Sequence, residues 1–340
     1  MKILFISRIP FRGVSGGRYG AALFAERLSR QGNDVDFLVN YDNSLIFPSD
    51  IISSIRLRRY LPLFIGRNAV LDGVIFALYL MTASVFFKKK FDHVIIVPEE
   101  ASFPLHRFFY RLAHIVGSKV HLLNFETPNW FNALAPFKRD PARWDGWRLI
   151  ADHGQSVISI SKTSDSYAKS FYGEGAIDYR WYDLPVYQED KIRPISWNQR
   201  GNSAICISRM DPHKGVDGLL DFVANCSELN DFHLVLGSMS SDKNFLLKLK
   251  ATCEMNKIQL FIHEKITHEE KFRLLGSVKY LVFPSYFEGL GMPPIEALAS
   301  GCKVAAFELT VLKEISPYIE FAEAGEFADL AAIVSAGLDR

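Results

Sequence analysis

The chain of 340 residues is longer than one hydrophobic core usually organises, so we expect two domains of ordinary size. Hydrophobic residues make up 49% and charged residues 23% of the chain, which is typical of a globular protein and excludes a disordered or fibrous one. The formal net charge of +1 gives no reason to expect a nucleic-acid partner. The four cysteines form no CxxC pair, so we expect buried thiols in a reducing compartment rather than disulfides or a metal site.

The first forty residues predict a strand, a glycine-rich loop, a helix and a second strand. An apolar run at residues 3–6 precedes the loop at 12–20. Residues 19–31 then carry apolar side chains at helical spacing, and a second apolar run follows at 35–39. Such a βαβ unit is right-handed and builds a parallel sheet.

The loop of this unit contains Gly16, Gly17 and Gly20, whose spacing does not fit the GxGxxG dinucleotide fingerprint. A tight turn without a ligand is one interpretation of these glycines. Asp34 and Asp36 form the only DxD sequence of the chain. They flank the start of the second strand, away from any glycine loop, and we interpret them as turn residues rather than as metal ligands.

Residues 55–90 combine basic and apolar side chains. Arginines alternate with apolar residues at 55–60, and three lysines at 88–90 close an apolar segment at 61–87. The uninterrupted apolar part, 74–87, is too short to span a bilayer, which needs about 20 residues. Two interpretations stay open: a helix buried in the N-terminal domain, or a surface that lies on an anionic membrane with its arginines and lysines at the headgroups.

The rest of the N-terminal half continues the alternation of strands and helices. We expect strands at 93–97, 119–124 and 156–160, and helices at about 101–116 and 162–172. Glu126 follows a strand at the carboxyl edge of the predicted sheet, where ligands bind in open α/β folds. Three roles are open for it: holding a hydroxyl group of one ligand, acting as a base toward a hydroxyl group of another, or satisfying a buried backbone N–H. His121 lies within a strand and His153 precedes one, and structural roles are favoured for both.

The stretch 184–202 contains two prolines and ends in polar turn residues. It predicts a linker between an N-terminal domain of residues 1–187 and a C-terminal domain of residues 188–340. Beyond the linker, we expect strands at 204–208, 232–237, 259–266, 280–283 and 304–307, with helices between them and a last helix at 327–338. This alternation predicts a second Rossmann-like domain.

The most informative stretch is PSYFEGLGMPPIEALASGCKV, residues 284–304, which follows an apolar strand. A strand, a loop with Gly289 and Gly291 and a helix that starts at the prolines describe a βα turn, and helix N-termini of this kind attract anions. Glu288 lies in the loop and Glu296 about one turn into the helix, so both carboxylates can accept hydrogen bonds from one ligand over the turn. A nucleotide sugar, with phosphates in its middle and hydroxylated rings at both ends, has the matching chemistry.

This stretch resembles the donor-site signature of the retaining glycosyltransferases of GT-B fold, family 4, also called glycosyl transferases group 1. The resemblance implies an α/β fold with two Rossmann-like parallel-sheet domains facing a central cleft. It implies that the acceptor enters over the first domain and that the second binds most of the donor. It also implies that Glu288 contacts the donor sugar and Glu296 the nucleotide ribose. For the two glutamates alone, a solvated loop residue and an ordinary helix residue are the alternative.

The resemblance extends to residues elsewhere in the chain. Arg209 and Lys214, in SRMDPHKG, match the basic pair that holds the donor diphosphate and stabilises its charge as the sugar–phosphate bond breaks. Surface salt bridges are the alternative for this pair. Glu126 stands near the place where most of the family has a histidine against the donor sugar, so this chain departs from the family there. Donor contacts are implied for Gly16, Gly17, Gly237, Ser238, Lys265, Ile266, Gly289, Leu290, Gly291 and Met292.

These expectations describe a hexosyltransferase of polysaccharide biosynthesis, which moves a sugar from a nucleotide-sugar donor to a hydroxyl of a glycan or lipid-linked saccharide with retention of anomeric configuration. We expect no metal and no cofactor, because fixed cations would stabilise the leaving diphosphate. Two other functions stay open: a GT-B epimerase or phosphorylase, and a non-catalytic nucleotide-sugar binding protein, which the departure at Glu126 would suit. No secretory signal is visible, so we expect a cytoplasmic protein, with peripheral attachment to the inner face of the membrane as the consequence of a lipid-binding segment at 55–90.

Overall fold

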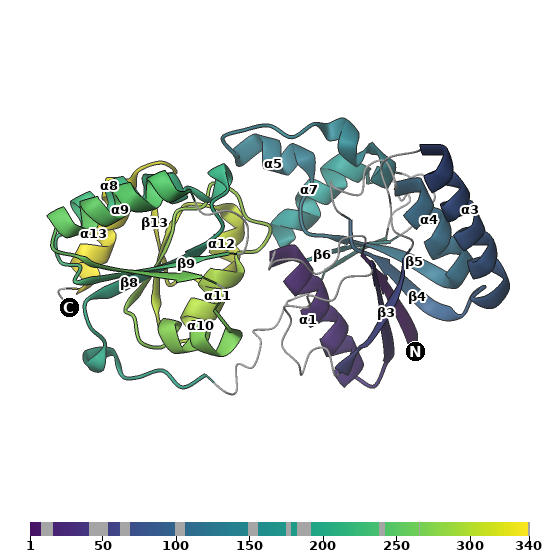
Figure 1. Cartoon of the computed structure of the whole chain (residues 1–340), viewed down its shortest axis with the longest axis horizontal. Coiled ribbons are helices and arrows are strands. Elements are labelled where there is room, and N and C mark those ends of the chain that lie inside the picture. The colour runs from purple at the N-terminus through teal and green to yellow at the C-terminus, as the bar shows by residue number, and fades with distance from the viewer. Residues whose placement is uncertain are drawn as a thin grey trace. The chain divides into compact units, whose positions relative to one another are not determined.

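The computed structural model describes residues 1–7, 16–40, 54–61, 69–98, 106–148, 156–174, 178–181, 192–237, 242–264 and 266–338. The chain forms two compact units, each built around one parallel β-sheet (Figure 1). The first unit comprises Met1–Phe131 and Arg139–Pro185, and the second comprises Asn132–Lys138 and Val186–Arg340. The sequence predicts a boundary between the two domains after residue 187, and this boundary stays a prediction.

The sheet of the first unit has the strand order β3-β2-β1-β4-β5-β6-β7. Its strands are β1 Lys2–Ile6, β2 Asp34–Asn40, β3 Arg56–Leu61, β4 Phe91–Ile96, β5 Gly117–Asn124, β6 Ser156–Ser159 and β7 Asp178–Trp181. Its helices are α1 Gly16–Arg30, α3 Ala69–Phe86, α4 His106–Val116, α5 Pro128–Leu134, the 3-10 helix η2 Pro141–Arg148, and α7 Lys162–Tyr172.

Alternating side chains of β1 explain how helices cover both faces of this sheet. Phe5 stacks on Phe37 of β2 and meets Phe24 of α1 edge to face. Leu4 and Ile6 point to the other face, into a core cluster with side chains of α3, α4 and α7. The pattern follows from the period of two along a strand, and it leaves α1 on one face and the other three helices on the opposite one.

The second unit has the strand order β10-β9-β8-β11-β12-β13. Its strands are β8 Ser203–Ser208, β9 Asp231–Leu236, β10 Gln259–Glu264, β11 Tyr280–Phe283, β12 Lys303–Phe307 and β13 Ile319–Ala322. Its α-helices are α8 Leu219–Asn225, α9 Lys243–Met255, α10 His268–Leu275, α11 Met292–Ala299, α12 Thr310–Ile315 and α13 Phe327–Leu338. Side chains of α8, α9 and α13 form one core cluster with the sheet, and α10 and α11 lie on the opposite face (Figure 1).

The order of these strands creates a topological switch point. The chain runs outward from β8 to β9 and β10, and it then returns to β11 on the other side of β8. Both β8 and β11 are parallel to their neighbours, so their carboxyl ends lie at the same edge of the sheet. Ligands of open α/β sheets bind at such a point.

Two predictions for the first βαβ unit are wrong. Gly16 and Gly17 begin helix α1 instead of lying in the preceding loop, and a Cβ on Gly17 would already contact the Phe125 ring at 3.6 Å. Asp34 lies at the start of β2 rather than in a turn, and Asp36 lies within this strand. Their carboxylates both pair with Arg56 of the neighbouring strand β3 and raise the pKa of its guanidinium above the ordinary value. These cross-strand ion pairs hold the edge strand β3 against β2, and they give both aspartates a structural role.

The apolar segment after β3 forms helix α3, of which only one side is buried. Phe76 and Ala83 are buried, whereas Val74, Leu78 and Met81 are exposed. The interpretation of this segment as a buried helix therefore holds for one side alone. Within the ranges that the structure describes, no helix combines the length and the apolar character needed to cross a membrane.

Candidate functional site

Two loops join at the switch point of the second sheet, one after β8 and the other after β11. Tyr286 N donates a hydrogen bond of 2.9 Å to His213 O, and Ser285 Oγ lies 3.2 Å from the same oxygen. Gly215 has a left-handed φ of +63°, and a Cβ there would lie 2.1 Å from Pro284 O. The β8 loop can therefore lie directly on the β11 loop only because this residue has no side chain.

This contact brings together Lys214 and Glu288, which are 74 residues apart in the chain. Lys214 Nζ lies 2.6 Å from Glu288 Oε1, and the two side chains are only 16% and 12% exposed. In such surroundings a charge needs a partner, so each group holds the other in place. The pair sets a cation and a hydrogen-bond acceptor side by side at the carboxyl edge of the sheet.

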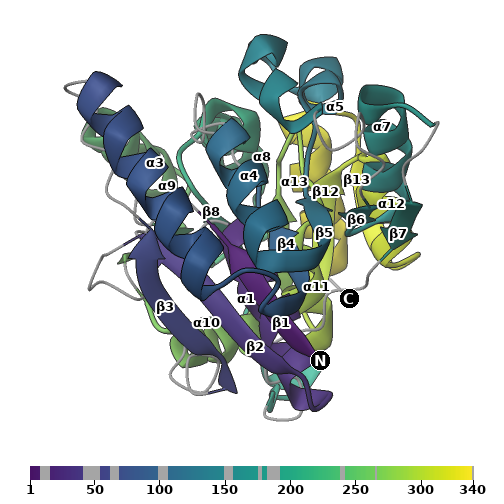
Figure 2. The same cartoon turned by 90° about the vertical axis from the view of Figure 1, so that its right-hand side faces the viewer.

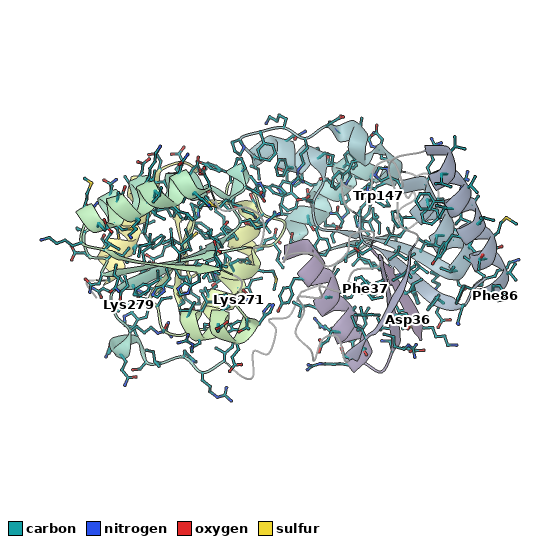
Figure 3. All side chains as sticks on the ribbon, in the orientation of Figure 1. Asp36, Phe37, Phe86, Trp147, Lys271 and Lys279 are labelled. Atoms are coloured by element: carbon teal, nitrogen blue, oxygen red, sulfur yellow. The ribbon has the colours of Figure 1, made fainter. Side chains whose placement is uncertain are left out.

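A second ion pair, with a buried carboxylate, joins the helix of the same turn to the helix before it. Glu296 of α11 is 2% exposed, and its Oε1 lies 2.6 Å from Lys271 Nζ. Lys271 belongs to α10 and is labelled in Figure 3. Glu296 is predicted from the sequence as a site residue, whereas Lys271 is not. A signal was present, because Lys271 stands three and four residues before Leu274 and Leu275, which are buried. This spacing places the lysine on the inward side of an amphipathic helix.

Arg209 supplies a third cation, which is more open to solvent. Its Nη2 lies 2.9 Å from Asp211 Oδ2, and its side chain is 30% exposed. Gly237 follows β9 directly, and its N–H donates a hydrogen bond of 2.9 Å to Ser208 O. A Cβ on Gly237 would lie 2.8 Å from Arg209 Cγ, so this glycine makes room for the arginine stem across the end of the strand. Arg209 is therefore better placed than Lys214 to meet an incoming anion first.

The start of helix α11 offers fewer backbone donors than the sequence analysis assumed. Gly291 precedes the helix with a φ of +91°, and Pro293 and Pro294 follow within the first turn. A proline has no N–H, so two of the amides that normally remain unsatisfied at a helix N-terminus are missing. An anion bound here would depend mainly on Arg209 and Lys214 for its neutralisation.

The other predicted donor residues of the second unit are distributed around this turn. Gly289 and Leu290 are half-buried in the β11 loop, and Met292 is buried at the start of α11. Ile266 is half-buried and precedes Thr267, whose side chain caps α10 in a capping box with Glu270. Ser238 and Lys265 lie outside the described residues.

Glu126 of the first unit is held by a side chain. Its carboxylate accepts a hydrogen bond from Arg139, whose guanidinium carbon lies 3.6 Å from the centre of the Phe131 ring. The structure thus gives Glu126 a charged partner, and its three predicted roles stay predictions. His121 hydrogen-bonds to His93, with 2.8 Å between the ring nitrogens, inside the sheet. His153 lies outside the described residues.

The four cysteines are buried and free, in agreement with the sequence analysis. Burial raises the pKa of both Cys206 and Cys302 to about 12, which keeps these thiols protonated at neutral pH. Among the residues that the structure describes, no three His, Cys, Asp or Glu side chains form a group that could hold a metal ion. The absence of a metal from the reaction stays a prediction.

Comparison with known proteins agrees with this architecture. Residues 188–316 match the family described as "Glycosyl transferases group 1". The chain is 32% identical over 54% of its length to the MMP alpha-(1->4)-mannosyltransferase of Mycolicibacterium hassiacum, and 27% identical over 47% to the O-antigen chain mannosyltransferase RfbU of Salmonella typhimurium. These matches span 46% and 44% of the two relatives, so the chain matches about half the length of each.

Solved structures resemble the whole chain. Sucrose-phosphate synthase from Thermosynechococcus elongatus has a TM-score of 0.76 at 17% identity, over 99% of this chain and 90% of its own. HepE from Anabaena, in complex with UDP and glucose, has a TM-score of 0.71 at 13% identity, over 99% and 89%. At such identities the likeness shows the fold alone, and it confirms the predicted α/β class and GT-B fold. The chain thus has the GT-B fold, and its residues 188–316 match the glycosyl transferases group 1 family.

Proposed function

We propose that this protein is a glycosyltransferase that moves a sugar from a nucleotide-sugar donor to a hydroxyl group of an acceptor. The observation that carries the proposal is the presence of two largely shielded ion pairs, Lys214–Glu288 and Lys271–Glu296, of which Glu296 is buried and the other three side chains are half-buried, beside the switch point of the second sheet. A lysine suits a phosphate group, and a carboxylate suits the hydroxyl groups of a sugar. A nucleotide sugar presents both kinds of group at about the spacing of one βα turn.

In this proposal the donor diphosphate binds Arg209 and Lys214. Lys214 then shares its charge with the phosphates, and Glu288 accepts hydrogen bonds from the donor sugar. Glu296, which Lys271 holds in position, accepts hydrogen bonds from the ribose hydroxyls. Gly237 and the loop from Gly289 to Met292 let the donor approach the backbone closely.

The reaction then exchanges one bond at the anomeric carbon for another. The bond from this carbon to the diphosphate oxygen breaks, and the acceptor oxygen bonds to the carbon on the same face, so the anomeric configuration is retained. The acceptor proton passes to the departing diphosphate oxygen. Arg209 and Lys214 stabilise the negative charge that develops on the diphosphate, and this is the main contribution of the site to the rate. We assign Glu126, which follows β5 at the carboxyl edge of the first sheet, a role in holding a hydroxyl group of the acceptor.

The relatives suggest where the search for substrates should begin. Both curated relatives are named mannosyltransferases, and one is named for the O-antigen chain. We therefore propose a hexose, with mannose first, as the transferred sugar, and a saccharide or lipid-linked saccharide as the acceptor, in polysaccharide biosynthesis.

The test is turnover of UDP-, GDP- and ADP-linked hexoses, with and without saccharide acceptors, by the full chain. We expect one donor to release its sugar slowly without an acceptor and faster with one, and the Glu296→Gln variant to lose most of both activities. The matched control is Lys250→Gln on α9, which removes one side of an exposed pair with Glu254, and it should keep full activity.

Other outcomes of this assay would overturn the proposal in distinct ways. Conversion of the donor into another nucleotide sugar would indicate an epimerase, and dependence on free phosphate would indicate a phosphorylase. Binding of a nucleotide sugar with no release and no transfer would indicate a non-catalytic binding protein.

A further inference from the structure

Helix α3 is apolar on two opposite sides. Its inner side packs on α4, where Phe76 stacks on Phe108 with 4.4 Å between the ring centres. Its outer side carries apolar side chains three and four residues apart, which therefore form one continuous stripe. Five residues, between 47% and 73% exposed, form this outer stripe: Leu71, Val74, Leu78, Met81 and Val85.

The size of the outer stripe calls for a partner. Phe86, which is 71% exposed, extends the stripe at the carboxyl end of α3, at the outer surface of the first unit (Figure 3). Globular proteins that act alone rarely expose a contiguous apolar surface of this kind, and a helix that is apolar all round is normally covered.

Basic side chains border the outer stripe. Lys88 and Lys90 follow α3 directly and are exposed. Lys89 between them donates hydrogen bonds of 2.9 Å to His114 O and 2.6 Å to Gly117 O, which fixes this turn to the end of α4. The lysines are therefore held at a defined place beside the stripe rather than on a loose end.

The neighbouring helix adds two more cations. α4 lies beside α3 (Figure 2) and exposes Arg107 and Arg111, which are one turn apart. No acidic residue occurs in the sequence of α4, and α3 contains only Asp72. Positive charge thus lies at the end of the outer stripe and on the exposed side of the helix next to α3.

This combination selects an anionic lipid surface over a second copy of the chain. A two-fold dimer with parallel copies of α3 would bring Lys88 and Lys90 of one copy toward the same residues of the other, which is unfavourable, and an antiparallel dimer would offer the cations no acidic residue of α3 or α4 except Asp72. At a lipid surface the apolar side chains enter the acyl boundary while the lysines and arginines meet anionic headgroups. α3 cannot act as a spanning helix, since none of the described helices meets that requirement.

We propose that α3 lies in the plane of an anionic membrane surface, with its outer stripe in the acyl boundary and Lys88, Lys90, Arg107 and Arg111 at the headgroups. Arg56, which lies in the same basic and apolar segment of the sequence, takes no part in this contact because Asp34 and Asp36 hold it. The inference stands on the described faces of α3 and α4 and does not depend on the chemistry of the second unit.

The test is cosedimentation of the full chain with vesicles of phosphatidylcholine, with and without phosphatidylglycerol, at low and high salt. We expect binding only to vesicles that contain phosphatidylglycerol, and weaker binding at high salt. The Leu78→Glu, Met81→Glu double variant should lower the partition coefficient at least about tenfold, because both carboxylates would have to enter the acyl boundary. The Lys88→Gln, Lys90→Gln double variant should lower it by about fivefold for each lysine.

The matched controls make the same chemical changes on α9 of the second unit. Leu247 and Met255 are 67% and 83% exposed, and Leu247→Glu with Met255→Glu should leave vesicle binding unchanged. Lys243→Gln with Lys248→Gln is the control for the lysine pair. Equal losses in test and control variants would overturn the assignment to α3, and so would equal binding to neutral vesicles.

Two further outcomes would also overturn the proposal. If the wild-type chain binds neither kind of vesicle, α3 has no lipid-binding surface. If the wild-type chain is a dimer and the Leu78→Glu, Met81→Glu variant is a monomer, the partner of the stripe is a second copy of the chain. Nucleotide-sugar turnover measured on the same variants separates this inference from the proposed function. A variant of α3 that loses vesicle binding and keeps turnover would support the lipid contact and leave the proposed function standing. A wild-type chain that binds vesicles but turns over no nucleotide sugar would overturn the proposed function and leave the lipid contact standing.

Discussion

Replacing Gly215 by alanine tests whether the contact between the β8 and β11 loops positions Lys214. A non-glycine residue in the left-handed region, here at a φ of +63°, costs about 1–2 kcal/mol. The added Cβ would also lie 2.1 Å from Pro284 O, a backbone atom that moves only if the end of β11 moves. Overlap of this kind adds about 1–3 kcal/mol. We therefore expect the free energy of unfolding of the second unit to fall by about 2–5 kcal/mol.

The assay is urea unfolding together with a titration by the preferred nucleoside diphosphate. Gly325→Ala is the matched control, because Gly325 has a φ of +98° in the same unit but its Cβ would meet nothing closer than Tyr286 Oη at 3.8 Å. In Gly325→Ala the free energy of unfolding should fall by the backbone cost alone, and the affinity for the nucleoside diphosphate should not change. Gly215→Ala should be destabilised further and should also bind the nucleoside diphosphate more weakly. Equal destabilisation of the two variants with equal affinity would refute the idea that this contact builds the site.

Three further predictions concern the second unit. Lys214→Gln should lower kcat more than it raises the KM for the donor, since the cation stabilises charge that develops as the bond breaks, and a change in KM alone would contradict this role. Lys271→Met leaves the carboxylate of Glu296 buried without its cation and should lower the free energy of unfolding, measured in urea, by about 2–4 kcal/mol. Adding Glu296→Gln to the same chain should restore part of this loss. Additive effects of the two substitutions would argue against the pair. Burial lowers the pKa of His233 to about 4, so between pH 6.5 and 4 the unfolded chain binds a proton that the folded chain does not. Stability should therefore fall from pH 7 to pH 5, by about 1 kcal/mol after solvent screening, and an unchanged slope in His233→Gln would exclude this histidine as the cause.

The interior elements of both sheets could be predicted from the sequence, but several edge strands could not. The apolar periodicity of residues 327–338 predicts the helix that the structure shows as α13, because this helix packs against the core along its length. The missed strands are β3, β7 and β13, and each lies at an edge of its sheet. An edge strand pairs on one side only and tolerates charged residues, as in RLRRYL of β3 and DYRW of β7, so it lacks the apolar signal of a central strand.

The candidate site was predictable to the extent that its residues lie in loops of unusual composition. Arg209, Lys214 and Glu288 stand in two such loops, which follow strands and contain glycines. Lys271 was missed because it lies in an ordinary helix and meets Glu296 only through the packing of α10 on α11. The left-handed conformation of Gly215 was equally invisible, since it follows from the approach of a loop about seventy residues away in the chain.

The most direct test of the central claim is calorimetric titration of the wild-type chain and of Glu296→Gln with UDP, GDP and ADP. We predict that one of these ligands binds at one site per chain, that Glu296→Gln weakens this binding at least about tenfold, and that Lys250→Gln leaves it unchanged. A folded wild-type chain that binds none of the three, or a Glu296→Gln variant that binds as tightly as the wild type, would contradict the assignment of this turn as the donor site.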